Sequence, residues 1–186
     1  MMVKIENTPN PDTLKFLPGK KVSEVGSIEF LKNDKSNKKI PLANKILSLK
    51  GTTMVFFGED FITVKKEKNL NWNDLKHGII AEINDYYLQG NNVVIKKNSK
   101  KNFLKPDLSS SDEITKKINE VLDAKVRPAV ARDGGDIVFK SFNDGVVKVE
   151  LKGSCSGCPS SIMTLKQGVQ NLLCHYIPEV KSVEAI

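Results

Sequence analysis

The feature that most constrains this chain is the segment Cys155-Ser156-Gly157-Cys158-Pro159, which follows a strand-like run and precedes a helix-like run. Two cysteines separated by two residues can bind one metal centre or form a disulfide with each other, and a helix N-terminus favours their thiolate forms. The chain has one other cysteine, Cys174. Because a tetrahedral zinc site or a cubane iron-sulfur site needs four ligands, one copy of this motif supplies only half of them. The other half must come from elsewhere.

The C-terminal part of the chain predicts a small domain around this cysteine loop. N-capping residues at Ser111-Asp112 precede an apolar pattern of helical spacing that runs to Val126, and Pro128 should kink or end that helix. Two strands, 137–142 and 146–151, are joined by an Asn-Asp-Gly turn. A helix over 159–176 follows, which Pro159 opens and Pro178 ends, with Leu165, Val169 and Tyr176 on its apolar face. A final strand covers residues 180–185. The predicted order is αββαβ over residues 111–186.

The N-terminal part predicts a second, separate α+β domain over residues 1–90. Its expected strands are 13–17, 27–31, 53–57 and 61–65, and its expected helices are 41–49 and 71–88, the latter capped by Asn71 or Asn73. Residues 91–110 are rich in Lys, Asn and Ser and indicate a linker, in which Val93 to Ile95 either docks on a neighbouring surface or adds a short strand. The fold class is therefore α+β with two small domains.

Charge and hydropathy limit the partners. The net charge of +7 is uneven, with 19 Lys against 11 acidic residues up to Lys105 and 8 Lys plus 2 Arg against 11 acidic residues after it. Scattered lysines with almost no Arg are typical of a solvated surface, so we expect no nucleic-acid interface. No apolar run approaches the roughly 20 residues that span a bilayer, and the N-terminus lacks the pattern of a targeting peptide. These features predict a soluble, cytoplasmic protein, in a compartment where thiols stay reduced.

Two other uses of the cysteine pair stay open: a dithiol/disulfide redox site and a zinc-stabilised interaction module. A thioredoxin-type site also places its cysteines at a helix start, but here Pro159 follows the second cysteine, no aromatic precedes the first, and we expect the βαβ surroundings of that fold to be missing. Cys174 is expected to pack rather than bind metal, and Asp133 and Asp136 are explained by the Gly-Gly turn between them. Since no nucleophile with a base and no phosphate loop is visible, we predict that the protein is not an enzyme.

The simplest way to reach four thiolates is a symmetric homodimer in which each copy contributes Cys155 and Cys158. The small residues of the loop, Ser154, Ser156 and Gly157, leave room for backbone amides to point at sulfur, which stabilises an anionic cluster. Such a cluster would lie near the surface between two protomers and could be removed.

The sequence resembles the NifU-like (Nfu) family of iron-sulfur cluster proteins at both ends. In the C-terminal part the resemblance rests on Arg127-Pro128, on Asp133-Gly134-Gly135-Asp136, on residues 153–161 around the cysteines, and on Ile177-Pro178-Glu179-Val180. In the N-terminal part it rests on residues 8–16, 41–43 and 61–65, which are similar to the family's N-terminal domain.

The resemblance implies a scaffold or carrier that holds a labile 4Fe-4S cluster between two protomers through Cys155 and Cys158, a 2Fe-2S form being left open. It implies iron-sulfur assembly proteins as donors and apo-proteins as recipients of the cluster. The N-terminal domain would then serve partner recognition, with Phe61 and Trp72 as candidates, although core packing is the simpler interpretation of both.

Overall fold

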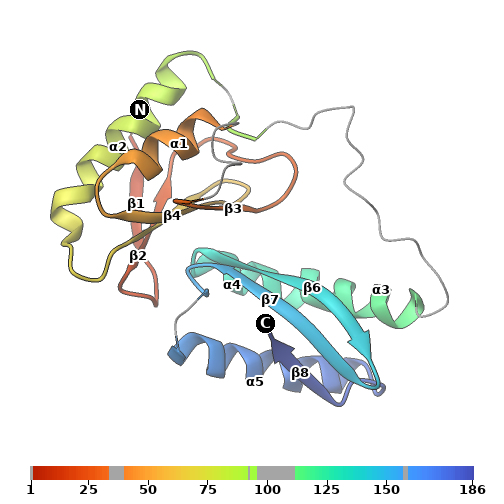
Figure 1. Cartoon of the computed structure of the whole chain (residues 1–186). Helices are drawn as coiled ribbons and strands as arrows, with labels where there is room; N and C mark the ends of the chain where they lie inside the picture. Colours follow the sequence, from red (N-terminus) through yellow and green to blue (C-terminus); the bar gives the residue numbers. More distant parts are fainter. Residues whose placement is uncertain (1, 34–39, 92, 96–111, 157–158) are drawn as a thin grey trace.

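The computed structural model describes residues 2–33, 40–91, 93–95, 112–156 and 159–186 (Figure 1). The described elements form two sheets with helices packed on them, which confirms the α+β class. We call the elements from β1 to α2 the N-terminal unit and those from α3 to β8 the C-terminal unit.

The N-terminal unit is an antiparallel sheet with the strand order β1-β2-β5-β4-β3. Its strands and helices are β1 (Lys4–Asn7), β2 (Thr13–Leu17), β3 (Ile28–Leu31), α1 (Pro41–Ser48), β4 (Thr52–Phe57), β5 (Ile62–Lys66) and α2 (Trp72–Leu88). The Asn71 side chain caps α2 by accepting a hydrogen bond from the backbone N–H of Asn73, as expected. The edge strand β1 was not predicted, although Val3-Lys4-Ile5-Glu6 alternates between apolar and polar residues; it is short, and all four of its residues are exposed.

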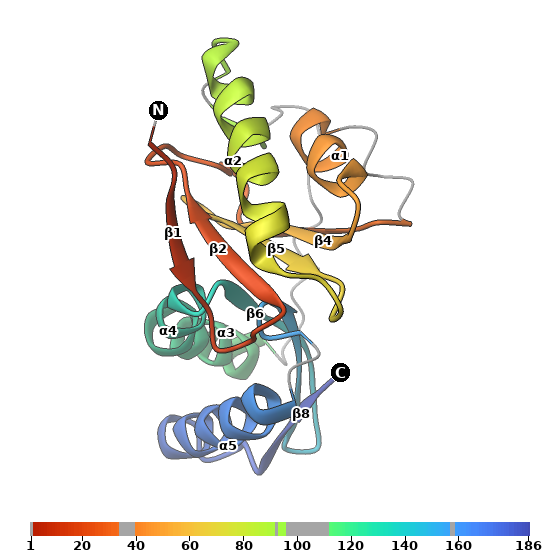
Figure 2. The ribbon, with the colours of Figure 1, turned by 90° about the vertical axis from the view of Figure 1, so that its left-hand side faces the viewer.

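Both faces of the first sheet are buried, and the alternation along its strands shows how. Leu14 and Phe16 of β2 point into the core beneath α1 and α2, whereas Thr13 and Lys15 point to the opposite face, and all four side chains are buried. Figures 1 and 2 show that α1 and α2 cover one face and that the C-terminal unit lies against the other. Val94 and Ile95 also join the first core, and Ile95 forms an isolated bridge with Ser23.

The C-terminal unit has the predicted order αββαβ. It consists of α3 (Asp112–Val121), the π-helical turn η2 (Leu122–Val126), α4 (Arg127–Arg132), β6 (Gly135–Asn143), β7 (Val146–Gly153), α5 (Pro159–Tyr176) and β8 (Ser182–Ala185). The helix does not end at Pro128: a π-helical turn precedes that residue, which then occupies the first turn of α4, where proline is tolerated. Asp144 and Gly145 take positive φ angles of 52° and 89° in the hairpin turn.

Two expectations for this unit were wrong. Tyr176 is 51% exposed: it is the last residue of α5, at the end of the face by which Val169 and Leu173 enter the core, and its ring contacts that of His175. The unit also does contain a βαβ arrangement: β8 pairs with β7 in parallel, so α5 is a crossover helix between parallel strands. The cysteine loop therefore lies where such a unit passes from strand to helix.

Candidate functional site

A pair of glycines sets the base of the cysteine loop. Gly135 opens β6 and lies opposite Gly153, which ends β7 with φ of 67°. The Ser154 N–H donates to Gly134 O at 3.1 Å, and the Ser156 N–H donates to Gly153 O at 3.2 Å. A Cβ atom at Gly135 would lie 2.8 Å from Cys155 Sγ and 2.6 Å from Lys152 O. No side chain fits there, so glycine is what allows the loop to pass this close to β6.

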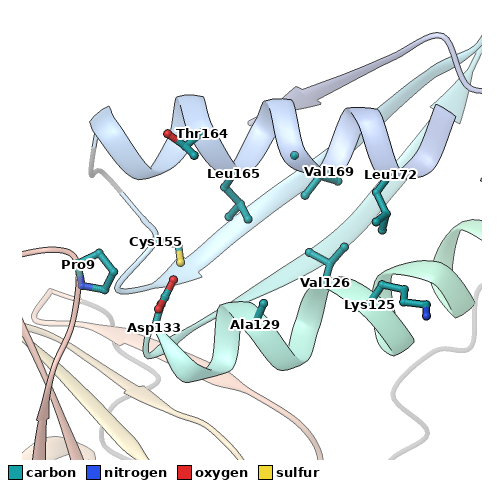
Figure 3. A pocket seen from close by; sticks show the side chains of 11 residues that line it. Pro9, Lys125, Val126, Ala129, Asp133, Cys155, Thr164, Leu165, Val169 and Leu172 are labelled. Carbon is teal, nitrogen blue, oxygen red and sulfur yellow. The ribbon is translucent and has the colours of Figure 1, made fainter. Parts of the chain in front are cut away.

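Cys155 lies at one end of an apolar groove between the helices of the C-terminal unit. The groove has a volume of about 520 Å³ and runs between η2 with α4 on one side and α5 on the other. Its walls include Val126, Ala129, Leu165 and Val169, and Figure 3 shows the sulfur near Asp133 at the end where Pro9 of the N-terminal unit also lies. Only 4% of Cys155 is exposed.

The second predicted ligand, Cys158, lies outside the described residues. The structure therefore places one of the two predicted thiols, and the pairing of Cys155 with Cys158 stays a prediction. Within the described ranges, no group of three or more His, Cys, Asp or Glu side chains could hold a metal ion.

The N-terminal unit donates hydrogen bonds directly to the cysteine loop. Asn10 Nδ2 donates to Ser154 O at 3.1 Å, and the Thr13 hydroxyl donates to Ser154 Oγ at 3.0 Å. Asn10, Thr13 and Ser154 are all buried. Thr63 Oγ1 donates to Gly134 O at 2.8 Å, in the turn on which the loop rests. Nothing in the sequence indicated that these polar residues serve the loop.

Two lysines bring positive charge to the same place. Lys65 Nζ lies 3.5 Å from Ser156 O, and Lys15 Nζ lies 3.3 Å from Arg132 O. Lys15 also forms an ion pair with Glu6 at 3.2 Å. Lys15 is therefore already paired, and Lys65 brings its positive charge to the backbone of the cysteine loop.

The remaining sequence candidates have structural roles. Asp136 accepts a hydrogen bond from Ser27 and lies 3.5 Å from Arg127 Nε, so it ties the turn to its surroundings. Asp133 lines the groove beside Cys155. Cys174 packs, half-buried, against the second core, as expected.

The two aromatic candidates for partner recognition pack inside the protein. Phe61 is buried with Met54 and Phe56 against Ala131 of the C-terminal unit. Trp72 is half-buried, and its Nε1 donates to Pro11 O at 3.0 Å. The packing interpretation is therefore confirmed for Phe61, and the structure gives Trp72 an internal partner.

Comparisons with known families match this architecture unit by unit. Residues 3–90 match the family described as scaffold protein Nfu/NifU N terminal, and residues 118–184 match the NifU-like domain. The two matches cover the two units and include the cysteine loop.

Whole-length relatives share the same arrangement. The chain is 43% identical to the NFU1 iron-sulfur cluster scaffold homolog, mitochondrial, of Homo sapiens, over 100% of this chain and 72% of the human protein. It is 45% identical to the homolog of Drosophila persimilis, over 100% of this chain and 65% of that protein. The chain belongs to the Nfu/NifU-like family of iron-sulfur cluster scaffold proteins. It spans about two thirds of the length of the fly relatives.

A solved structure gives a further, partial match. The solution NMR structure of a NifU-like protein from Saccharomyces cerevisiae covers 53% of this chain and 87% of its own, with 29% identity and a TM-score of 0.48. No helix in the described part of the chain is long and apolar enough to cross a membrane. The relatives' names include the word mitochondrial, so the cytoplasmic location stays a prediction without support from them.

Proposed function

We propose that this protein is an iron-sulfur cluster scaffold and carrier. In this proposal Cys155 and Cys158 of two protomers hold one 4Fe-4S cluster, which passes to apo-proteins. The observation that supports it most directly is the position of Cys155, in a glycine-based loop at the end of β7 and at the mouth of a groove. Family membership agrees with this cargo, since the relatives are named as cluster scaffolds.

The ligand count supports a shared site. Within the described part of one protomer, no group of three or more His, Cys, Asp or Glu side chains could hold a metal ion, and Cys174 packs with the core of the C-terminal unit. Four thiolates are the usual ligand set of a cubane cluster. Two cysteine loops related by a two-fold axis would supply that set, which is why we propose a homodimer in the loaded form.

The loop has features that suit an anionic cargo. Its residues Ser154 and Ser156 are small and polar, and the Lys65 ammonium group lies 3.5 Å from Ser156 O. Hydrogen bonds and positive charge around thiolate sulfur stabilise a cluster and tune its potential. Because the cluster would bridge two surfaces rather than lie inside one core, it could be released to a recipient with little cost to the fold.

Anaerobic reconstitution with iron and sulfide tests this proposal. We expect one 4Fe-4S cluster per two protomers by Mössbauer spectroscopy and iron analysis, together with a dimeric mass in solution. Cys155→Ala and Cys158→Ala should each abolish both the cluster and the dimer. Cys174→Ala is the matched control and should retain both, since that thiol packs away from the loop. An iron-free monomer from the unaltered chain would refute the proposal.

A dithiol/disulfide redox site is the second candidate, because the β7-α5-β8 unit places the cysteines before a crossover helix between parallel strands. This function predicts a monomer that forms a reversible Cys155 to Cys158 disulfide in the absence of iron. Mass spectrometry of the oxidised, alkylated chain would detect that disulfide. The redox candidate is excluded if both thiols remain alkylatable under mild oxidation while the chain still assembles a cluster.

A further inference from the structure

The contacts between the two units converge on the cysteine loop. Three buried polar side chains of the N-terminal unit, Asn10, Thr13 and Thr63, donate hydrogen bonds to Ser154 and Gly134, with distances between 2.8 and 3.1 Å. Their exposed fractions are 4%, 2% and 0%. Buried polar groups need partners. Asn10 Nδ2 and the Thr63 hydroxyl find theirs in the other unit, whereas the Thr13 hydroxyl also lies 3.1 Å from Asn10 O within its own unit.

The N-terminal unit also accepts a hydrogen bond from the C-terminal unit. Glu29 Oε2 accepts from the backbone N–H of Gly153 at 2.7 Å, at the residue where β7 enters the loop. The fit is close, because a Cβ at Gly153 would lie 3.1 Å from Cδ1 of Phe56. The N-terminal unit therefore offers hydrogen-bond donors, an acceptor and an apolar contact to one short stretch of backbone in the C-terminal unit. This complementarity indicates a specific interface rather than an accidental contact.

Cys155 belongs to the buried core of the C-terminal unit, and the interface adds a cover at its end of the groove. The loop that contains Asn10 also contains Pro9, and Pro9 lines the groove at the end where Cys155 lies. Only 4% of Cys155 is exposed. A thiol that bridges to a second protomer must reach the surface, together with space for the partner's loop.

We propose that the N-terminal unit is an intramolecular cap on the cysteine loop. It docks through Asn10, Thr13, Thr63 and Glu29, keeps Cys155 buried in the iron-free chain, and separates from the loop before a second copy of the chain docks there. The docked arrangement, in which the N-terminal unit covers the cysteine loop, is proposed for the iron-free protein alone. The displacement by a second copy rests on the function proposed above.

The balance of energies suits a cap that opens. A hydrogen bond in water contributes a net factor of about five to an equilibrium, since water replaces the lost partner on opening. Interfaces between domains of one chain resemble transient protein interfaces, so relative motion is expected. Hydrogen bonds of this size, together with the packing of Phe56 and Phe61 against Ala131, can therefore hold the loop without locking it.

Hydrogen exchange at the Gly153 amide tests the cap on the iron-free, full-length chain. The double variant Asn10→Ala/Thr63→Val removes two interface donors and leaves the Gly153 to Glu29 pair intact. We expect the exchange rate of the Gly153 amide, measured by NMR, to rise on the order of tenfold. The Ser154 amide, which donates to Gly134 O within the C-terminal unit, should change less.

Thr52→Val is the matched control. The Thr52 hydroxyl is also buried, but it donates to Ile46 O and Leu49 O inside the N-terminal unit. This variant should weaken the N-terminal unit and leave the Gly153 amide within about twofold of the unaltered chain. Circular dichroism verifies that each variant is folded. Equal exchange at Gly153 in the double variant and the unaltered chain, both folded, would overturn the cap.

Alkylation of Cys155 gives a second readout. In a Cys158→Ser/Cys174→Ser background, a neutral thiol reagent should modify Cys155 several-fold faster when Asn10→Ala/Thr63→Val is added. The alkylation rates of the two proteins are compared at high pH, where the rate no longer rises with pH. The comparison then reports how accessible the Cys155 sulfur is to the reagent. An unchanged limiting rate would show that the N-terminal unit does not shield the thiol, and would overturn the proposal.

Cluster loading tests the displacement step separately. On reconstitution we expect the Gly153 amide to lose its protection as the dimer forms. A loaded dimer with full protection at Gly153 would overturn displacement and leave the scaffold function standing. Failure to load at all would refute the scaffold function, while the exchange and alkylation results on the iron-free chain would still decide the cap.

Discussion

At the residue scale, the site depends most on a position that carries no side chain. Gly135→Ala would place a methyl group 2.8 Å from Cys155 Sγ and 2.6 Å from a backbone carbonyl. Since the Lys152 carbonyl cannot move without shifting β7 against β6, we expect a loss of about 1–3 kcal/mol in the free energy of unfolding. Cluster loading should fall as well. Chemical denaturation and iron analysis after reconstitution measure the two effects.

Gly168→Ala is the control for that substitution. Gly168 lies within α5, and a Cβ there would meet no atom within 4 Å. Alanine in a helix interior is favoured over glycine, so this variant should be more stable by about 0.5–1 kcal/mol and should load normally. If Gly135→Ala behaved like Gly168→Ala, the close approach of the loop to β6 would not matter for the site.

The sequence indicated candidate ligand residues, but it did not indicate the residues that contact their loop. Cys155 and Cys158 follow from spacing and ligand chemistry alone. Thr13 and Thr63 do not, because each lies on the polar face of an alternating strand, and such a face ordinarily points to water. Only the tertiary arrangement shows that the C-terminal unit covers that face and turns these hydroxyls into partners of the loop.

At the element scale, helix α2 carries a pair of tyrosines whose ionisation is linked to folding. Burial, and then the neighbouring Tyr86, raise the pKa of Tyr87 to about 12, from an ordinary value of about 10. Its hydroxyl donates to Lys21 O at 3.3 Å. The folded state thus favours the neutral phenol, and this contribution is complete below about pH 10 and is lost as the pH rises toward 12.

Thermal unfolding between pH 9 and 12 should therefore show a falling midpoint for the N-terminal unit above about pH 10. Tyr87→Phe should make that fall less steep, because one group with a raised pKa is removed. Ultraviolet absorbance of phenolate measures the ionisation itself. A Tyr87 phenol that titrates at its ordinary pKa in the folded chain would contradict the prediction.

Local signals predicted the elements well and their pairing less well. Asn71 as a cap and the Asn143-Asp144-Gly145 turn are read from neighbouring residues alone, and both are confirmed. The parallel pairing of β8 with β7 depends on how a crossover helix packs, which no short pattern encodes. For the same reason the βαβ arrangement escaped the sequence analysis, although each of its three elements was predicted.

At the scale of the whole molecule, each unit has its own core of apolar side chains, and a smaller cluster of Met54, Phe56 and Phe61 packs against Ala131 between them. Buried apolar residues of the N-terminal unit include Phe16, Phe57 and Ile79, and those of the C-terminal unit include Ile118, Ile137 and Leu173. Each core is closed by its own strands and helices. Folding should therefore not depend on the cargo, in contrast to a zinc-stabilised module, which unfolds when its metal is removed.

Chelation distinguishes these two behaviours. When a chelator strips iron from the loaded dimer, we expect colour to disappear and the mass to fall to that of a monomer, while the far-ultraviolet circular dichroism stays unchanged. Ligand loss lowers stability only by mass action, so the unfolding midpoint of the stripped chain should match that of a chain never exposed to iron. Loss of circular dichroism on chelation would instead indicate a structural metal, because only a fold that depends on its ion collapses when the ion leaves. Sedimentation and circular dichroism on the same sample, before and after chelation, give both readouts at once.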